Sequence, residues 1–182
     1  MRMLICDNMD LCTDAEVQRL LPLVSSQRRD EALRYKHTFG QWTALQSWLM
    51  LRELGLPDKP WAYNEHGKPY LPDGPHFSIS HCKQGIAVAI NDQPIGIDIE
   101  SYRDVTPDLI AHSMNDKEQH TINAAENPTI AFIELWTRKE AYLKYQGVGI
   151  IDDLHHALDN TQGVNLQTIT TPTYAYTICT QS

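Results

Sequence analysis

Two acidic residues alternate with isoleucines in the run from Ile95 to Glu100, which reads IGIDIE. In an extended strand this alternation puts Gly96, Asp98 and Glu100 on one face, with the two carboxylates about 6 to 7 Å apart. Two hard oxygen ligands at this spacing can hold a magnesium ion that takes its other ligands from water and phosphate oxygens. Gly96 has no side chain, so we expect it to leave room for a ligand. The ordinary alternative is the solvated face of an edge strand.

A second group of side chains that could take part in catalysis or binding lies in the run 132–144, FIELWTRKEAYLK. Helical spacing places Trp136, Glu140 and Lys144 four residues apart on one face. Glu140 is suited to complete the metal site or to act as a general base, and Lys144 is suited to neutralise a phosphate. The alternative is a surface Glu-Lys pair that stabilises the helix by roughly 0.3 to 0.5 kcal/mol.

Two shorter motifs offer groups that bind anions. The run FSISH ends in Ser80 and His81, which can donate to a phosphate, and no acid near them suggests a serine-hydrolase triad. A structural role for the histidine is the alternative. The GKP motif holds Lys68 on a rigid turn, which suits an anion contact and equally an ordinary surface turn.

Helical signals flank these motifs on both sides. Thr13 and Glu16 have the spacing of a capping box, as do Asn115 and Glu118. Proline after Asn127 suits the first position of a helix. The expected helices run from Thr13 to Leu20 or Leu21, from Ser26 to Leu54 in one or two pieces, from Asn115, and from Pro128 to about Tyr145, where Gly147 and Gly149 end the last one.

Short β-branched runs predict the strands. They are 77–80, 86–90 and 95–99, which we expect at the centre of a sheet, and a strand-like tail at 164–179. The Gly- and Pro-rich segment 64–75 is expected to be a loop with a short extended piece at 68–71. The order helix, sheet, helix, sheet predicts an α+β fold of two similar lobes, residues 1–100 and 101–182, each with a long helix packed on a small antiparallel sheet.

Composition limits the class of protein. The chain has 182 residues, of which 42% are apolar and 21% charged, enough for a folded core. Its net charge of −8 argues against a nucleic-acid binder. Asp7 and Asp10 interrupt any signal peptide, no 18-residue apolar run predicts a membrane span, and the four cysteines are scattered, so we expect a cytoplasmic protein.

The order of the motifs is itself informative. GKP, FSISH, IGIDIE and LWTRKEAYLK followed by GVGI resembles the motif series of the 4′-phosphopantetheinyl transferase superfamily, in particular its pseudo-dimeric, surfactin-synthetase-activating type. The likeness runs from Glu65 to Ile150. It implies a holo-acyl-carrier-protein synthase that moves the 4′-phosphopantetheine arm of coenzyme A to a serine of an apo acyl or peptidyl carrier protein. Adenosine 3′,5′-bisphosphate would be released.

The resemblance also implies roles for single residues. Coenzyme A would lie in a cleft between the lobes, and Mg²⁺ would be held by Asp98, Glu100 and Glu140. Glu140 would be the base, directly or through water, and Lys144 would stabilise the developing charge. The implied phosphate contacts are Ser80, His81 and Lys68, and Lys139 is a further candidate for a phosphate or carboxylate contact.

The chain departs from the family in its first long helix. An expected arginine is Thr43, so Arg34, Lys36 or His37 would supply the missing positive charge. The chain is short for this type, which implies that the C-terminal lobe has lost a strand or loop. Because carrier proteins are typically acidic, the docking face must be locally neutral or basic, or must bind by apolar contacts.

Two other functions remain open. One is a non-catalytic module that binds coenzyme A or a nucleotide, and the other is a different magnesium-dependent phosphoester enzyme that uses water as its nucleophile. A monomer is expected, since two lobes in one chain already form the cleft.

Overall fold

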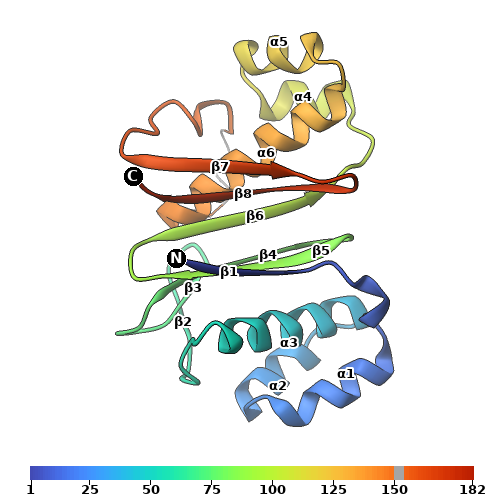
Figure 1. Cartoon of the computed structure of the whole chain (residues 1–182), viewed down its shortest axis with the longest axis vertical. Helices are drawn as coiled ribbons and strands as arrows, with labels where there is room; N and C mark the ends of the chain where they lie inside the picture. Colours follow the sequence, from blue (N-terminus) through green and yellow to red (C-terminus); the bar gives the residue numbers. More distant parts are fainter. Residues whose placement is uncertain (150–153) are drawn as a thin grey trace.

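Two small antiparallel sheets lie between two layers of helices (Figure 1). The computed structural model describes residues 1–149 and 154–182. The first sheet has the strand order β1-β5-β4, and the second has the order β6-β8-β7. This architecture confirms the predicted α+β class. No helix in the described ranges has the length and apolar content that a bilayer crossing requires.

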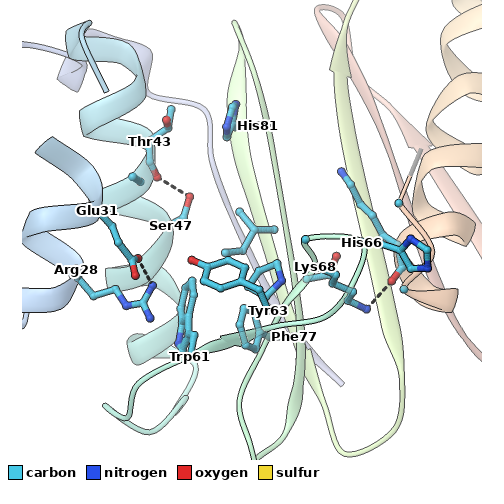
Figure 2. A pocket seen from close by; sticks show the side chains of 18 of the residues that line it. Arg28, Glu31, Thr43, Ser47, Trp61, Tyr63, His66, Lys68, Phe77 and His81 are labelled. Atoms are coloured by element: carbon cyan, nitrogen blue, oxygen red, sulfur yellow. Dashed lines mark hydrogen bonds and ion pairs between the residues drawn. The ribbon is translucent and has the colours of Figure 1, made fainter. Parts of the chain in front are cut away.

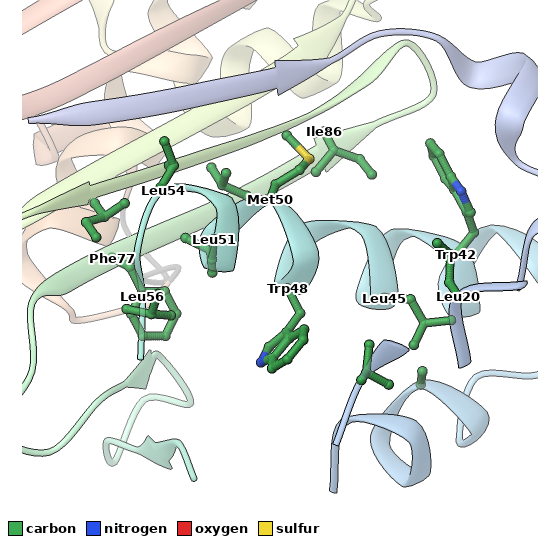
Figure 3. Packing of buried hydrophobic residues seen from close by; sticks show 14 of the residues in the cluster. Leu20, Trp42, Leu45, Trp48, Met50, Leu51, Leu54, Leu56, Phe77 and Ile86 are labelled. Atoms are coloured by element: carbon green, nitrogen blue, oxygen red, sulfur yellow. The ribbon is translucent and has the colours of Figure 1, made fainter. Parts of the chain in front are cut away.

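The first sheet carries the N-terminal core on one face. Its strands are β1 (Arg2–Cys6), β4 (His76–Cys82) and β5 (Gly85–Asn91). Ile86, Val88 and Ile90 of β5 pack with side chains from three helices, and the alternating Ala87 and Ala89 face the second sheet. The helices are α1 (Asp14–Leu20), α2 (Ser26–Leu33) and α3 (Thr38–Glu53). In Figure 3 the leucine and tryptophan side chains of α3 fill this core against Phe77 and Ile86.

The second sheet packs on the alanine face of the first. Its strands are β6 (Ile95–Ser101), β7 (Val164–Thr170) and β8 (Tyr174–Gln181). Ile95, Ile97 and Ile99 share a core cluster with Ala87 and Ala89. The opposite face of the second sheet is covered by α6, because Ala141 packs with Cys179 and Phe132 with Ala175.

The remaining elements surround these layers. They are the hairpin strands β2 (Ala62–Tyr63) and β3 (Pro69–Tyr70), the helices α4 (Pro107–Ser113), α5 (Asp116–Ala124) and α6 (Pro128–Gln146), and the 3₁₀ turns Met9–Leu11, Leu21–Leu23 and Leu154–His156. Asn115 and Glu118 form the predicted capping box. At α1 only half of it forms, because Thr13 accepts from the Glu16 amide while the Glu16 carboxylate pairs with Arg19.

The three central strands were predicted correctly, but the prediction that they form one sheet was wrong. β6 pairs with β8 through residues 95–101, whereas β4 pairs with β5. Strand β1 was not predicted. The division of the chain at residue 100 stays a prediction, and the hydrogen bonds of β6 associate it with the C-terminal strands.

Gly96 makes room for a helix and not for a ligand, which corrects the expectation from the sequence. A Cβ atom at this position would overlap the carbonyl oxygen of Ala141 and lie 2.5 Å from the amide nitrogen of Tyr145. Both atoms belong to the backbone of α6, which cannot move aside as a flexible side chain can. The absence of a side chain at Gly96 therefore allows α6 to lie directly on β6.

We predict that Gly96→Ala lowers the free energy of unfolding by about 3 kcal/mol, because the methyl group must displace the helix. Urea denaturation measures this loss. Gly163→Ala is the control, since a Cβ there meets nothing within 4 Å and only its positive φ of 77° is strained. That strain costs about 1 kcal/mol. Equal losses in the two variants would contradict the close packing of α6 on β6.

Candidate functional site

A buried aspartate joins three elements at the junction of the two sheets. Asp98 of β6 is 3% exposed, and its Oδ1 accepts hydrogen bonds from Ser80 Oγ of β4 at 2.7 Å and from Lys144 Nζ of α6 at 2.6 Å. Lys144 Nζ also donates to Ser80 Oγ at 3.0 Å. The structure therefore brings Ser80, Asp98 and Lys144 together, although 64 residues separate the serine from the lysine.

Strand β4 also binds the free edge of β6 beside this group. Ser78 Oγ accepts a hydrogen bond from the Ile97 amide at 3.1 Å. A side-chain hydroxyl thus satisfies a backbone donor that no strand pairs. This bond holds β4 against β6 next to Ser80 and Asp98.

Two further carboxylates lie near Asp98. Burial raises the pKa of Glu100 to about 7, with repulsion from Asp98 and Glu140 adding to the rise and Arg103 and Lys144 opposing it. Burial, then repulsion from Asp98, also raises the pKa of Glu140, which is 7% exposed. Three acids near two cations, Lys144 and Arg103, give the site an excess of acidic groups, which favours a further cation.

Two carboxylate oxygens fit such a cation. Asp98 Oδ2 and Glu140 Oε1 are buried, and within residues 1–149 and 154–182 neither has a hydrogen-bond partner. Buried polar atoms are usually satisfied, so these two oxygens are available to a cation. In the same ranges no three acidic, histidine or cysteine side chains form a ready-made metal cage. The arrangement suits Mg²⁺, which binds through one or two carboxylates and completes its shell with water and phosphate oxygens.

A cavity of about 560 Å³ opens beside Lys144, the one member of this group that lines it. Its walls come from α2, α3, β4, the segment around β2 and β3, and the C-terminal end of α6. Figure 2 shows aromatic side chains at one end of it, and His81 and Lys68 on other walls. Among the lining residues are Arg28, Arg34, Thr43, Trp61, Tyr63, Lys68, Ser78, His81, Lys144, Gly147 and Gly149. Ile150, the last residue of the GVGI motif, lies outside the described residues.

Two of the predicted anion contacts line this cavity. The ring of His81 packs edge-on to Phe39 at 5.7 Å, and partial burial and the Lys144 cation lower the pKa of its imidazole. Lys68 Nζ donates to the carbonyl oxygens of Ile95, at 3.3 Å, and Lys144. Burial lowers the pKa of Lys68 to about 8, which leaves the amine mostly cationic at neutral pH.

Of the basic residues in the first helices, some line the cavity and others do not. Arg34 lines the cavity, whereas Lys36 is exposed and is not part of its wall. Sequence reasoning missed Arg28, which lies 3.7 Å above the Trp61 ring and pairs with Glu31 at 2.5 Å. The spacing of Arg28 and Glu31 on one helix was the signal that could have found the pair, but nothing in the sequence placed it at the cavity.

Lys139 is not brought to the site. Of the phosphate or carboxylate contact expected for it, the structure shows the carboxylate contact, with Glu118. The residue is 1% exposed, and its ammonium donates to Glu118 Oε2 at 2.6 Å and to the carbonyl oxygens of Leu154 at 2.7 Å and Ser113 at 3.0 Å. Three acceptors use all three N–H groups of a lysine. Lys139 therefore joins α4, α5 and the turn at Leu154 to α6.

Comparisons with known proteins show similarity to one family of enzymes. The sequence model of the 4′-phosphopantetheinyl transferase superfamily matches residues 94–181. The chain is 29% identical over 146 residues to the 4′-phosphopantetheinyl transferase Sfp of Bacillus subtilis, which covers 74% of this chain and 65% of Sfp. It is 30% identical over 136 residues to the 4′-phosphopantetheinyl transferase gsp of Aneurinibacillus migulanus, covering 70% and 57%. The chain thus spans less than two thirds of the length of these relatives.

A double-mutant cycle tests the ion pair at the centre of the site. We predict that Lys144→Met lowers the free energy of unfolding by about 2 kcal/mol, because it leaves the Asp98 charge buried. The value is below that of a fully buried pair because the Lys144 side chain is 28% exposed. Asp98→Asn combined with Lys144→Met should lose about 1 kcal/mol less than the sum of the single changes. Additive losses in urea denaturation would mean that the pair is not coupled.

Proposed function

Because the chain belongs to the 4′-phosphopantetheinyl transferase superfamily, we propose that it transfers the 4′-phosphopantetheine arm of coenzyme A to a serine of an apo acyl or peptidyl carrier protein. The observation that supports this proposal best is the group of Ser80, Asp98 and Lys144 beside a cavity, with two buried carboxylate oxygens that have no partner among residues 1–149 and 154–182. Such a site can hold a cation and bind a pyrophosphate next to it.

Glu140 is the proposed base. Its buried Oε1 has no partner among the described residues and is therefore open to accept a proton. The proton of the carrier serine hydroxyl passes to this carboxylate, directly or through water. The serine oxygen then attacks the phosphorus that bears the pantetheine arm. The bond from this phosphorus to the adjoining phosphate oxygen breaks, and adenosine 3′,5′-bisphosphate leaves.

Asp98, Glu100 and Glu140 are the proposed protein ligands of Mg²⁺. When bound, the metal would neutralise the pyrophosphate and the charge that develops on it. The excess of carboxylates over cations at this place and the raised pKa of Glu100 support this assignment. Some of these contacts would run through water, since the three carboxylates do not form a closed cage.

Basic side chains around the cavity are the proposed phosphate contacts. Ser80, which was expected among them, is left out because its hydroxyl already donates to Asp98 Oδ1. Lys144 uses two N–H groups on Asp98 and Ser80, so within the described residues one remains for a phosphate oxygen. Lys68 has the same arrangement, with two N–H groups on carbonyl oxygens. His81 and Arg34 complete the set on the cavity wall, to which Lys36 and Lys139 do not belong.

Localisation, oligomeric state, lobe organisation and partners are proposed on the same basis. We propose a cytoplasmic monomer in which residues 1–100 and 101–182 form two lobes and coenzyme A binds where they meet. We propose no nucleic-acid or membrane partner. A non-catalytic binding module and a phosphoester hydrolase are the two alternatives, and the assay of the reaction separates both from a transferase.

Intact-mass analysis tests the reaction itself. We expect an apo acyl carrier protein incubated with coenzyme A, magnesium and the protein to gain one phosphopantetheine arm, ~340 Da for the phosphoester adduct. Glu140→Gln should slow the gain by about 100-fold or more, because the base is lost. Glu134→Gln, on the same helix, is the matched control. Coenzyme A binding without any gain on several carriers would favour the non-catalytic module, and free phosphopantetheine would favour a hydrolase.

The metal proposal predicts a dependence of stability on magnesium. In the presence of coenzyme A, magnesium should raise the midpoint of thermal unfolding by a few degrees, since a ligand that binds only the folded state stabilises it. Asp98→Asn should remove most of this shift, and sodium chloride at equal ionic strength should not produce it. A shift of the same size in Asp98→Asn would exclude Asp98 as a ligand.

A further inference from the structure

The loop between β2 and β3 reaches across the cavity to the end of α6, and one asparagine organises it. Asn64 Oδ1 accepts the amides of His66 at 3.0 Å and Lys68 at 2.9 Å, which fixes the turn of its own loop. Asn64 Nδ2 donates to the carbonyl oxygen of Gly147 at 2.7 Å, 83 residues further along the chain. A single amide side chain thus shapes the loop and attaches it to α6.

Lys68 makes a second attachment from the same loop. Its ammonium donates to the carbonyl oxygen of Lys144 in the last turn of α6 and to that of Ile95 at the start of β6. Figure 2 shows the Lys68 side chain extending away from the aromatic end of the cavity toward this place. We call Asn64 and Lys68, with these bonds, the α6 clasp.

The end of α6 requires such partners. The last carbonyl groups of a helix have no partner within the helix. Gly147 ends α6 with a φ of 78°. The amides of Gly147 and Val148 both donate hydrogen bonds to the carbonyl oxygen of Leu143. The carbonyl oxygens of Lys144 and Gly147 are instead bound by the clasp. A cation at this end also interacts favourably with the helix dipole.

The clasp is directly connected to the candidate site. Lys144, whose backbone it holds, carries the ammonium that binds Asp98 and Ser80. The clasp residues and their neighbours form one wall of the cavity, which includes His66, Gly67, Lys68, Gly147 and Gly149. The backbone of Lys144 and the cavity wall are therefore held by the same few bonds.

We propose that Asn64 is a positioning residue for coenzyme A. Its bond to Gly147 holds the wall of the cavity against the last turn of α6, so that Lys144 and Lys68 are in place before the ligand binds. Asn64 itself contacts no reacting atom. This inference rests on the proposed function, because it takes coenzyme A as the ligand of the cavity.

Asn64→Asp removes the bond across the cavity but also adds a carboxylate charge, and Asn64→Ala separates the two effects because it removes the bond without adding a charge. The aspartate keeps an acceptor for the His66 and Lys68 amides, but it presents a carboxylate oxygen to the Gly147 carbonyl in place of a donor. Without the bond, coenzyme A must order the wall as it binds, which weakens binding. We expect the Kd for coenzyme A and its KM in the transfer reaction to rise about tenfold, the effect of one lost hydrogen bond to a neutral group.

Other quantities separate positioning from a general loss of structure. The KM for the carrier protein should change less than about twofold, and the urea midpoint should change little, since the loop keeps its own bonds. The control is Glu65→Gln, the next residue, whose side chain is 86% exposed and pairs only weakly with His66 at 3.5 Å. It should leave the Kd and both KM values unchanged. Asn64→Ala, which removes both sets of bonds, should raise the Kd for coenzyme A at least as much as Asn64→Asp.

The outcomes distinguish this inference from the proposed function. Transfer by the wild-type protein with an unchanged Kd and KM for coenzyme A in Asn64→Asp would overturn the clasp but leave the function intact. An equal rise in both KM values would also overturn it, because it would show a general loss of structure. If the wild-type protein binds coenzyme A without transferring the arm, the proposed function fails. The Kd values from calorimetry then still decide whether Asn64 prepares the cavity.

Discussion

The contact between the backbones of α6 and β6 at Gly96 determines where every other group of the site lies. Because Gly96 has no side chain, the helix can place Ala141 and Tyr145 directly over the strand. In the strand, Asp98 and Glu100 follow Gly96 on the same face, since side chains repeat every two residues. In the helix, Glu140 and Lys144 lie immediately before these two contact residues. One close approach therefore brings four charged side chains from two distant segments to the same place.

This arrangement concentrates charge in a buried place, which is unfavourable unless the charges are compensated. Lys144 and Ser80 satisfy one oxygen of Asp98, and the other oxygen has no partner within the described part of the chain. The raised pKa values of Glu100 and Glu140 show that the remaining carboxylates are held in an environment that disfavours their charge. A bound cation and the phosphates of coenzyme A would supply the missing partners. The buried ion pair of Lys139 and Glu118 is different, because two backbone carbonyl groups accept the remaining N–H groups of Lys139. This pair has a structural role and leaves no N–H group of Lys139 for a ligand.

Local patterns predicted much of the site and of the elements that carry it. The two-residue period of IGIDIE placed Asp98 and Glu100 correctly on one face, and helical spacing placed Glu140 and Lys144 on one stripe. Contacts between distant segments were not predictable in this way. Lys139 looks like a surface residue beside Glu140, but its partners include the backbone oxygens of Ser113 and Leu154, which carry no sequence signal.

The same limit explains the other differences between prediction and structure. The pattern of β6 shows which residues alternate but not which strand lies beside it, so its place in the second sheet was missed. Gly96 was correctly identified as leaving space, but the sequence could not show that a helix fills it. Asn64 acts through a backbone carbonyl of Gly147, and its role appears only when the fold brings the two together.

A crystal grown with coenzyme A and manganese, which scatters anomalously and replaces magnesium at oxygen sites, tests the central claim most directly. The account predicts one strong anomalous peak among Asp98, Glu100 and Glu140, at coordination distance from at least one of these carboxylates and from a pyrophosphate oxygen. It also predicts that the nucleotide lies along the cavity that Lys68 and His81 line. A peak remote from these carboxylates, or coenzyme A bound elsewhere on the protein, would contradict it.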